Sequence, residues 1–246
     1  RFMWAPYLTS YYFDPRISLS ADISRGFKLN VAWGKYKQFV TKTSVLDDYG
    51  NYYYIWTVAD NNDIPVLRST HFVGGFSYSK SGFNINIEAY TKSTTGLSRY
   101  YRRISEETEN LYSGQSKSIG ADIFIKQNFK GHSAWLAYSI SETEEKFDYQ
   151  IRDIWIQAPH SQKHELKLAG MINLDPFYLS SNYVYGSGFK LATRSLSDPY
   201  LETGHYSRLD GSVVYKFEIK SMSFETGLSV LNIFNKENIR FSNFER

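Results

Sequence analysis

Apolar and polar residues alternate with a period of two along nearly the whole chain, and helical periodicity is almost absent. From Phe83 to Ala89 the apolar side chains occupy the odd positions, and Asn or Glu occupies the even ones. From Leu209 to Ile219 the same alternation returns, with Val214 as an exception. The pattern predicts about ten β-strands with one apolar and one polar face. Further runs of this kind cover residues 17–23, 27–33, 72–78, 119–125, 134–140 and 166–174.

Two kinds of connection separate these runs, and the two kinds alternate strictly. The short ones carry turn-forming residues and lie at 24–26, 80–82, 130–131, 175–176 and 220–221. The long ones are polar and irregular, and they cover roughly 43–68, 100–114, 147–163 and 191–205. This order predicts an antiparallel up-and-down sheet with tight turns at one end and long loops at the other.

Strand length favours a membrane-spanning wall. The runs approach or exceed the ~9–11 residues that cross a bilayer with tilt, and they exceed the ~5–6 residues of an average soluble strand. Aromatic residues lie near strand ends, as in the girdles of membrane barrels. We therefore predict an all-β, antiparallel up-and-down transmembrane β-barrel; a soluble β-sandwich fits the alternation equally well and remains the alternative. The aromatic residues in question are Trp33, Tyr36, Tyr78, Tyr90, Tyr138, Tyr183, Tyr185, Tyr215 and Phe217.

Composition excludes several classes. The 246 residues include 28 basic and 25 acidic side chains, and a net charge of +3 is too weak a field to favour nucleic-acid binding. The absence of Cys excludes disulfides, thiolate metal sites and a Cys nucleophile. No apolar run approaches the ~18 residues of a membrane helix. Because the chain opens at Arg1 without a signal peptide and stops at Arg246 without a closing element, we expect it to be a piece of a longer protein.

Eight short strings, in their order and spacing, resemble the C-terminal half of the β-barrel of a TonB-dependent outer-membrane receptor. The resemblance implies that residues 1–246 supply about ten strands of a 22-stranded barrel, without its plug domain, early strands and final strand. The last string resembles the penultimate strand of that family. The strings lie at 14–20, 34–39, 87–92, 118–122, 134–141, 164–168, 206–210 and 227–235.

The resemblance also implies location and function. Such a protein lies in the outer membrane of a Gram-negative bacterium and imports a ligand with energy from the TonB complex. Its partners would be outer-membrane lipid, the plug domain of the same protein, the TonB complex through the missing N-terminal part, and in some cases a surface lipoprotein. The ligand would be a small molecule such as an iron chelate or vitamin B12, a glycan or a peptide. No cofactor and no enzyme activity are expected.

Charged residues that occupy the polar positions of the alternating pattern are expected on one face of the sheet. This face would line the lumen or meet the plug. A charge on the lipid face would cost ~2–4 kcal/mol at mid-bilayer, so their shared place in the pattern is informative. For any one residue, solvation of a wet wall or cross-strand pairing is the favoured interpretation over plug binding. These residues are Glu88, Asp122, Lys126, Lys167, Arg208 and Asp210, with Lys216 and Glu218.

Two segments are candidates for ligand contact. Tyr52, Tyr53, Tyr54 and Trp56 lie near Asp47, Asp48, Asp60 and Asp63, and aromatic rings beside carboxylates suit sugars, peptides or cations. A loop that simply packs on its neighbours is the alternative. Arg99, Arg102 and Arg103 form a second candidate, suited to an anionic ligand or a lipopolysaccharide phosphate. Glu106, Glu107 and Glu109 follow closely, so pairing within this loop fits equally well.

Signals for catalysis are weak. His160 and His164 have the i, i+4 spacing of a helical metal site, but Pro159 precedes them and a strand follows, so we expect no metal. Ser187 lies between two glycines in a string too short for a nucleophile elbow. The enzyme alternative is a complete ten-stranded outer-membrane barrel with His205 and either Asp198 or Asp210 at its rim.

Overall fold

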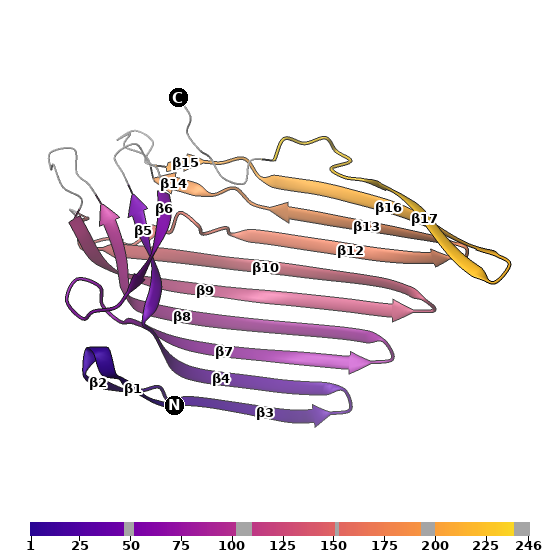
Figure 1. Cartoon of the computed structure of the whole chain (residues 1–246). Coiled ribbons are helices and arrows are strands. Elements are labelled where there is room, and N and C mark those ends of the chain that lie inside the picture. Colours follow the sequence, from indigo (N-terminus) through magenta and orange to yellow (C-terminus); the bar gives the residue numbers. More distant parts are fainter. Residues whose placement is uncertain (47–51, 102–109, 151–152, 193–199, 239–246) are drawn as a thin grey trace.

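The computed structural model describes residues 1–46, 52–101, 110–150, 153–192 and 200–238. Ten strands form the main path of one antiparallel sheet, and each lies beside its neighbour along this path (Figure 1). The all-β antiparallel meander is therefore confirmed. In order the strands are β3 (Arg16–Ser24), β4 (Phe27–Gln38), β7 (Leu67–Lys80), β8 (Phe83–Tyr101), β9 (Asn110–Phe129), β10 (His132–Phe147), β12 (His164–Leu174), β13 (Phe177–Gly186), β16 (Tyr206–Ile219) and β17 (Met222–Val230).

Tight turns join the strands at one end of the sheet, as the turn-forming residues predicted (Figure 1, right). In the β7–β8 turn Ser81 and Gly82 both have positive φ, and Lys130 and Gly131 repeat this between β9 and β10. Positive φ at both central residues is the geometry that matches the twist of antiparallel strands, and glycine adopts it without strain. The five short connections therefore lie where they were predicted.

The sheet is open in the described part of the chain. The path ends at β3 and at β17, each with one neighbouring strand, so these residues do not close a barrel. β17 ends at Val230, so the string 227–235 is only partly strand. The segment after Val230 turns instead, with positive φ at Asn232 and Asn235.

The prediction of irregular loops at the other end is wrong for part of that sequence. β8 ends at Tyr101 and β9 begins at Asn110, so both strands enter the expected 100–114 loop, and β5 (Val40–Leu46) with β6 (Tyr52–Val58) forms a hairpin that overlaps 43–68. The hairpin is rich in Tyr, Val and Thr, whose β-propensity outweighs the polarity of the segment. Smaller pieces are β1 (Phe2–Ala5), the 3-10 turn Pro6–Leu8, β2 (Ser10–Phe13), β11 (Ile156–Gln157), β14 (Lys190–Ala192) and β15 (Tyr200–Glu202).

The small hydrophobic core of the described chain lies at this long-loop end, not behind the sheet. Tyr12 of the β1–β2 hairpin is buried with Ala59 and Val66, and its ring lies 5.0 Å from that of Phe39. Ala5 completes the cluster. The hairpin is thereby held against the segment that leads into β7, while the described residues of the long sheet wall form no comparable core.

Candidate functional site: the two sheet faces and the long-loop end

Strand register sorts the side chains of the sheet into two faces, because directly paired residues point to the same side. One cross-strand row joins Leu29, Phe76, Ile87 and Ile123. We call the side on which this row lies the apolar face. Many of its large side chains are exposed, among them Leu19 at 70% and Leu228 at 67%. Others exposed on this face are Ile17, Phe72, Ile119, Ile140, Ile172, Leu174, Leu179, Ile219, Met222 and Val230.

The apolar runs of β4, β7 and β9 stop at one level, whereas the run of β8 ends at Ala89. The row at this level is Trp33, Phe72, Thr91 and Ile119, which we call the boundary row. Toward the long-loop end the same face then becomes polar and basic. The next two rows are Lys35, Thr70, Ser93 and Lys117, followed by Lys37, Arg68, Thr95 and Gln115.

Aromatic rings gather on the apolar face near the tight turns. Phe27 and Tyr78 have ring centroids 4.2 Å apart, and Phe177 lies 4.9 Å from Tyr215. Phe217 extends this cluster, 5.4 Å from Tyr215. Two of the aromatics expected in a girdle lie elsewhere: Tyr36 pairs with Ser69 and Tyr90 with Gly120, both on the opposite, polar face.

The predicted inward-facing residues Glu88, Asp122, Lys126, Lys167, Arg208 and Asp210 all lie on the polar face. Some of them pair locally: Lys167 Nζ lies 3.0 Å from Glu165 Oε1, and Arg208 Nε donates to Asp210 Oδ1 at 2.8 Å. Glu88 and Asp122 are direct cross-strand neighbours, an arrangement that like charges disfavour. No described basic side chain forms an ion pair with either carboxylate.

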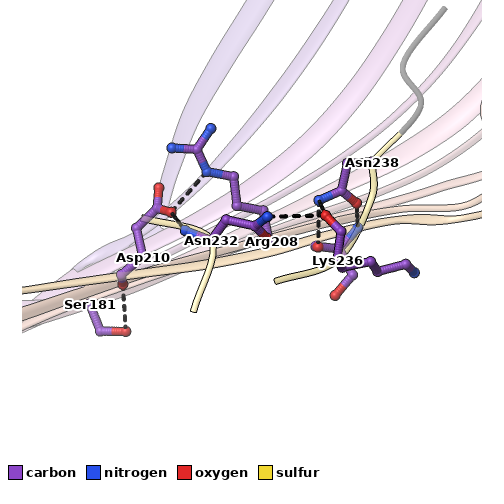
Figure 2. A network of polar contacts seen from close by, with 7 residues as sticks. Ser181, Arg208, Asp210, Asn232, Lys236 and Asn238 are labelled. Atoms are coloured by element: carbon purple, nitrogen blue, oxygen red, sulfur yellow. Dashed lines mark hydrogen bonds and ion pairs between the residues drawn. The ribbon is translucent and has the colours of Figure 1, made fainter. Parts of the chain in front are cut away.

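Asp210 also anchors the segment that follows β17 (Figure 2). Its Oδ1 accepts the backbone N–H of Asn232 at 2.8 Å. Farther along, the Asn238 side chain accepts from Ser207 N–H at 2.8 Å and donates to the Ser207 carbonyl at 2.9 Å. The Asn238 carboxamide thus forms the two hydrogen bonds that a neighbouring strand would form with Ser207. It satisfies backbone groups of β16 that lie beyond the end of β17 and have no partner there.

Arg99 is not at the surface, which corrects the prediction of an exposed cationic cluster. Its side chain is 2% exposed, and Nη2 lies 2.6 Å from Glu145 Oε2. Nε donates to Ser44 Oγ at 2.8 Å, Nη1 donates to the Tyr149 hydroxyl at 3.1 Å, and the guanidinium lies 3.9 Å from the Phe147 ring centroid. Arg99 therefore joins β5, β8 and β10 rather than meeting a ligand. Arg102 and Arg103 lie outside the described residues.

A one-residue bulge at Gly96 brings Arg99 to Glu145. The β8–β9 register shifts by one residue between Thr95 and Leu97. Without this shift the Arg99 side chain would lie on the apolar face; with it, Arg99 lies on the same face as Glu145. Gly96 has φ +81°, and a Cβ there would lie 2.7 Å from the Val66 carbonyl oxygen. A glycine isolated within a strand pattern is the sequence signal that this bulge offers.

The four aromatic candidates of the β5–β6 hairpin are described in part. Trp56 is 67% exposed and Tyr54 47% exposed, and Lys42 lies 5.2 Å and 5.9 Å from their ring centroids. Lys42 and Trp56 are direct cross-strand partners, so rings and cation share one accessible face. The backbones of Tyr52 and Tyr53 belong to β6, but their side chains lie outside the description, as do Asp47 and Asp48.

A groove of about 700 Å³ lies between the β1–β2 hairpin and the ends of β4 and β7. Its lining includes Tyr11, Phe13, Asn61, Lys37 and Arg68. Lys37 Nζ lies 2.6 Å from Asp14 Oδ1 and also donates to the Phe13 carbonyl at 2.8 Å. The sequence pattern did not single out Asp14 or Lys37, because their contact joins residues that are 23 positions apart.

The residues considered for catalysis are not assembled in the described chain. His164 Nδ1 contacts the Tyr138 hydroxyl at 2.8 Å, whereas His160 Nδ1 lies 3.9 Å from Glu145 Oε1. His205 packs on Tyr185, and Asp198 lies outside the description. The described residues contain no group of three His, Cys, Asp or Glu able to hold a metal ion, and no helix among them is long and apolar enough to span a membrane.

Comparison with known protein families gives no matching family, and no curated protein matches the chain.

Proposed function

We propose that this chain is part of the wall of an outer-membrane receptor and transporter of the TonB-dependent kind, which its strings resemble. On this proposal the apolar face contacts lipid and the polar face lines the lumen of the barrel. The long-loop end faces the outside of a Gram-negative cell, and the tight turns face the periplasm. The chain supplies wall and external surface, and it carries out no covalent step.

One observation carries the proposal: the apolar face is exposed, and its apolar runs on β4, β7 and β9 end together at the boundary row. A soluble sandwich would bury this face against a second sheet, whereas the described residues offer only a small core at the long-loop end. Exposed apolar surface of this extent marks an interaction surface, and a band with a sharp edge fits a bilayer of fixed thickness. The rings of Phe27, Tyr78, Phe177 and Tyr215 fit the aromatic girdle at the opposite edge.

The open edges of β3 and β17 are then paired by other strands of the full-length protein, because unpaired backbone groups in lipid cost several kcal/mol each. A 22-stranded barrel satisfies this requirement. Glu88 and Asp122, which lack a described basic partner, suit basic side chains of a plug domain inside it. The TonB complex would act through parts of the protein outside this chain.

Ligand contact is assigned to the exposed rings of Tyr54 and Trp56 beside Lys42, not to Arg99. Rings flanked by a cation suit a sugar or a peptide, with or without a surface lipoprotein that helps to deliver it. The remaining candidates Tyr52 and Tyr53 are the first two residues of the same strand, β6.

A pair of adjacent substitutions in β8 tests the lipid-facing assignment. Ile87→Arg places a charge on the apolar face, and we expect a loss of about 2–4 kcal/mol in the stability of the membrane-inserted form. Asn86→Arg, one residue earlier on the polar face, is the matched control and should insert normally. The measurement is the amount of full-length protein in purified outer membranes and its unfolding in detergent or lipid.

A soluble aromatic-rich binding module is the competing function. If the wild-type protein stays monodisperse without detergent and is absent from the membrane fraction, the transporter proposal is wrong. Equal insertion of both Arg variants would contradict the assignment of the two faces.

A further inference from the structure

The two basic rows beyond the boundary row contain more positive side chains than the described acidic side chains neutralise. Lys37 and Arg68 are direct cross-strand partners, and Lys35 lies two residues from Lys37 on the same face. Like charges placed directly opposite one another destabilise a sheet, and a nearby anion relieves the repulsion. Asp14 supplies such an anion for Lys37, and Lys35 and Arg68 remain.

Two acidic groups in this region, Asp14 and Asp60, are already engaged. Asp14 pairs with Lys37 at 2.6 Å, and its side chain is 1% exposed. Asp60 Oδ1 accepts the backbone N–H groups of Asn62 and Ile64, both at 2.9 Å, which holds the pKa of Asp60 below its ordinary value. No ion pair joins Lys35 or Arg68 to an acidic side chain in the described part of the chain, and both are exposed.

The surroundings of these two cations are apolar on one side and aromatic on the other. Toward the tight turns, Trp33 and Phe72 of the boundary row lie on the same face, immediately before Lys35 and Thr70. On the other side the groove of about 700 Å³ is lined by Arg68 together with Tyr11 and Phe13, whose side chains are 66% and 64% exposed. A molecule that fits here therefore needs an apolar tail and an anionic head.

We propose that Lys35 and Arg68, with Lys37 behind them, bind the phosphate of a lipid in the outer leaflet, whose acyl chains lie on the apolar face. This inference rests on the proposed function, because only a lipid-facing wall brings acyl chains to that face. The geometry follows the general rule that cations at the membrane interface attract anionic lipid head groups. Tyr11 and Phe13 then lie at head-group level, where aromatic side chains are favoured.

The test uses the full-length protein purified in a mild detergent. Its retention of phosphatidylglycerol is counted by native mass spectrometry against phosphatidylcholine with the same acyl chains. We expect the wild type to prefer the anionic lipid and the double variant Lys35→Gln/Arg68→Gln to lose roughly 10-fold or more of this preference. The control Lys28→Gln/Lys216→Gln removes two cations from the polar face and should retain it.

A gain-of-function variant makes the result independent of any folding defect. Thr70 lies opposite Lys35 in the first basic row, so Thr70→Lys should increase retention of phosphatidylglycerol. Equal retention by the wild type and the double variant would overturn the inference, as would displacement of the lipid by inorganic phosphate, which would indicate a site for a free anion. If the wild type inserts into membranes without preferring the anionic lipid, only the proposed lipid site is contradicted. If the wild type stays soluble without detergent, the proposed function as a membrane wall is contradicted as well.

Discussion

Two ion pairs of equal length lie at opposite ends of the sheet. Arg99 Nη2 and Glu145 Oε2 are 2.6 Å apart at the long-loop end, and Lys216 Nζ and Glu225 Oε1 are 2.6 Å apart near a tight turn. The first pair is 2% and 5% exposed, the second 44% and 60%. Water screens the second pair, whereas the first depends on its protein partners alone. Although the two distances are equal, loss of one partner is expected to destabilise the fold far more at the buried pair than at the exposed pair.

The same contrast applies to the two ends as a whole. Near the tight turns the strands expose both faces, and their stability depends on strand pairing and on the surrounding solvent or lipid. At the long-loop end Tyr12, Ala59 and Val66 form a core, and Arg99 ties three strands together. On the proposed function, the long-loop end can therefore keep a defined surface outside the membrane, which a ligand-binding end requires.

Arg99→Ala should have the largest effect on this contrast. It leaves Glu145 buried without its partner, which typically costs about 3–5 kcal/mol. Hydrogen exchange should rise in β5, in the end of β8 and near Glu145, while β16 and β17 stay unchanged. The double variant Arg99→Met/Glu145→Leu removes both charges and should recover most of the loss. Unchanged exchange in Arg99→Ala would show that the buried pair does not hold the long-loop end together.

Gly96→Ala tests the bulge that positions Arg99. The added Cβ meets the Val66 carbonyl at a backbone angle of φ +81°, so we expect a loss of about 1–3 kcal/mol. Gly74, where a Cβ would have nothing within 4 Å, is the matched control, and Gly74→Ala should be tolerated. Limited proteolysis near residues 96–101 is the measurement, and equal resistance of the two variants would contradict the role of the bulge.

Tyr149→Phe tests the pH dependence of the same cluster. Burial raises the pKa of Tyr149 above its ordinary value of 10.0, against the opposing attraction of Arg99. The folded state therefore holds the phenolic proton more tightly than the unfolded chain, so this contribution is complete below that value and is lost as the pH rises through the raised pKa. Proteolysis of the long-loop end should accelerate in this alkaline range in the wild type. An equal acceleration in Tyr149→Phe would assign the effect to another group.

Lys216→Ala should have the smallest effect, because an exposed pair contributes about 0–1 kcal/mol. Unfolding in denaturant, measured beside Arg99→Ala, gives the direct comparison. A loss as large as that of Arg99→Ala would remove the distinction between the two ends.

Several features of the candidate site could not be predicted from the sequence, because they depend on contacts between residues that are far apart in the chain. Arg99 follows a polar strand end and precedes Arg102 and Arg103, which favoured an exposed cationic cluster. A one-residue bulge reverses its direction, and Glu145 lies 46 positions away. The aromatic residues Tyr36 and Tyr90 have suitable positions for a girdle in the sequence, yet strand register places them on the polar face.

The long strands of the main sheet, the tight turns, their order and the division into an apolar and a polar face could be predicted from the sequence alone, because alternation and turn-forming residues act over a few neighbouring positions. The tertiary structure was needed to show that the apolar runs of β4, β7 and β9 end at one row, that Arg99 is buried against Glu145, and that Lys35 and Arg68 lie in adjacent rows of one face near a groove. Such outcomes depend on register and packing between strands that the chain separates. A side chain's own neighbourhood in the sequence does not contain that information.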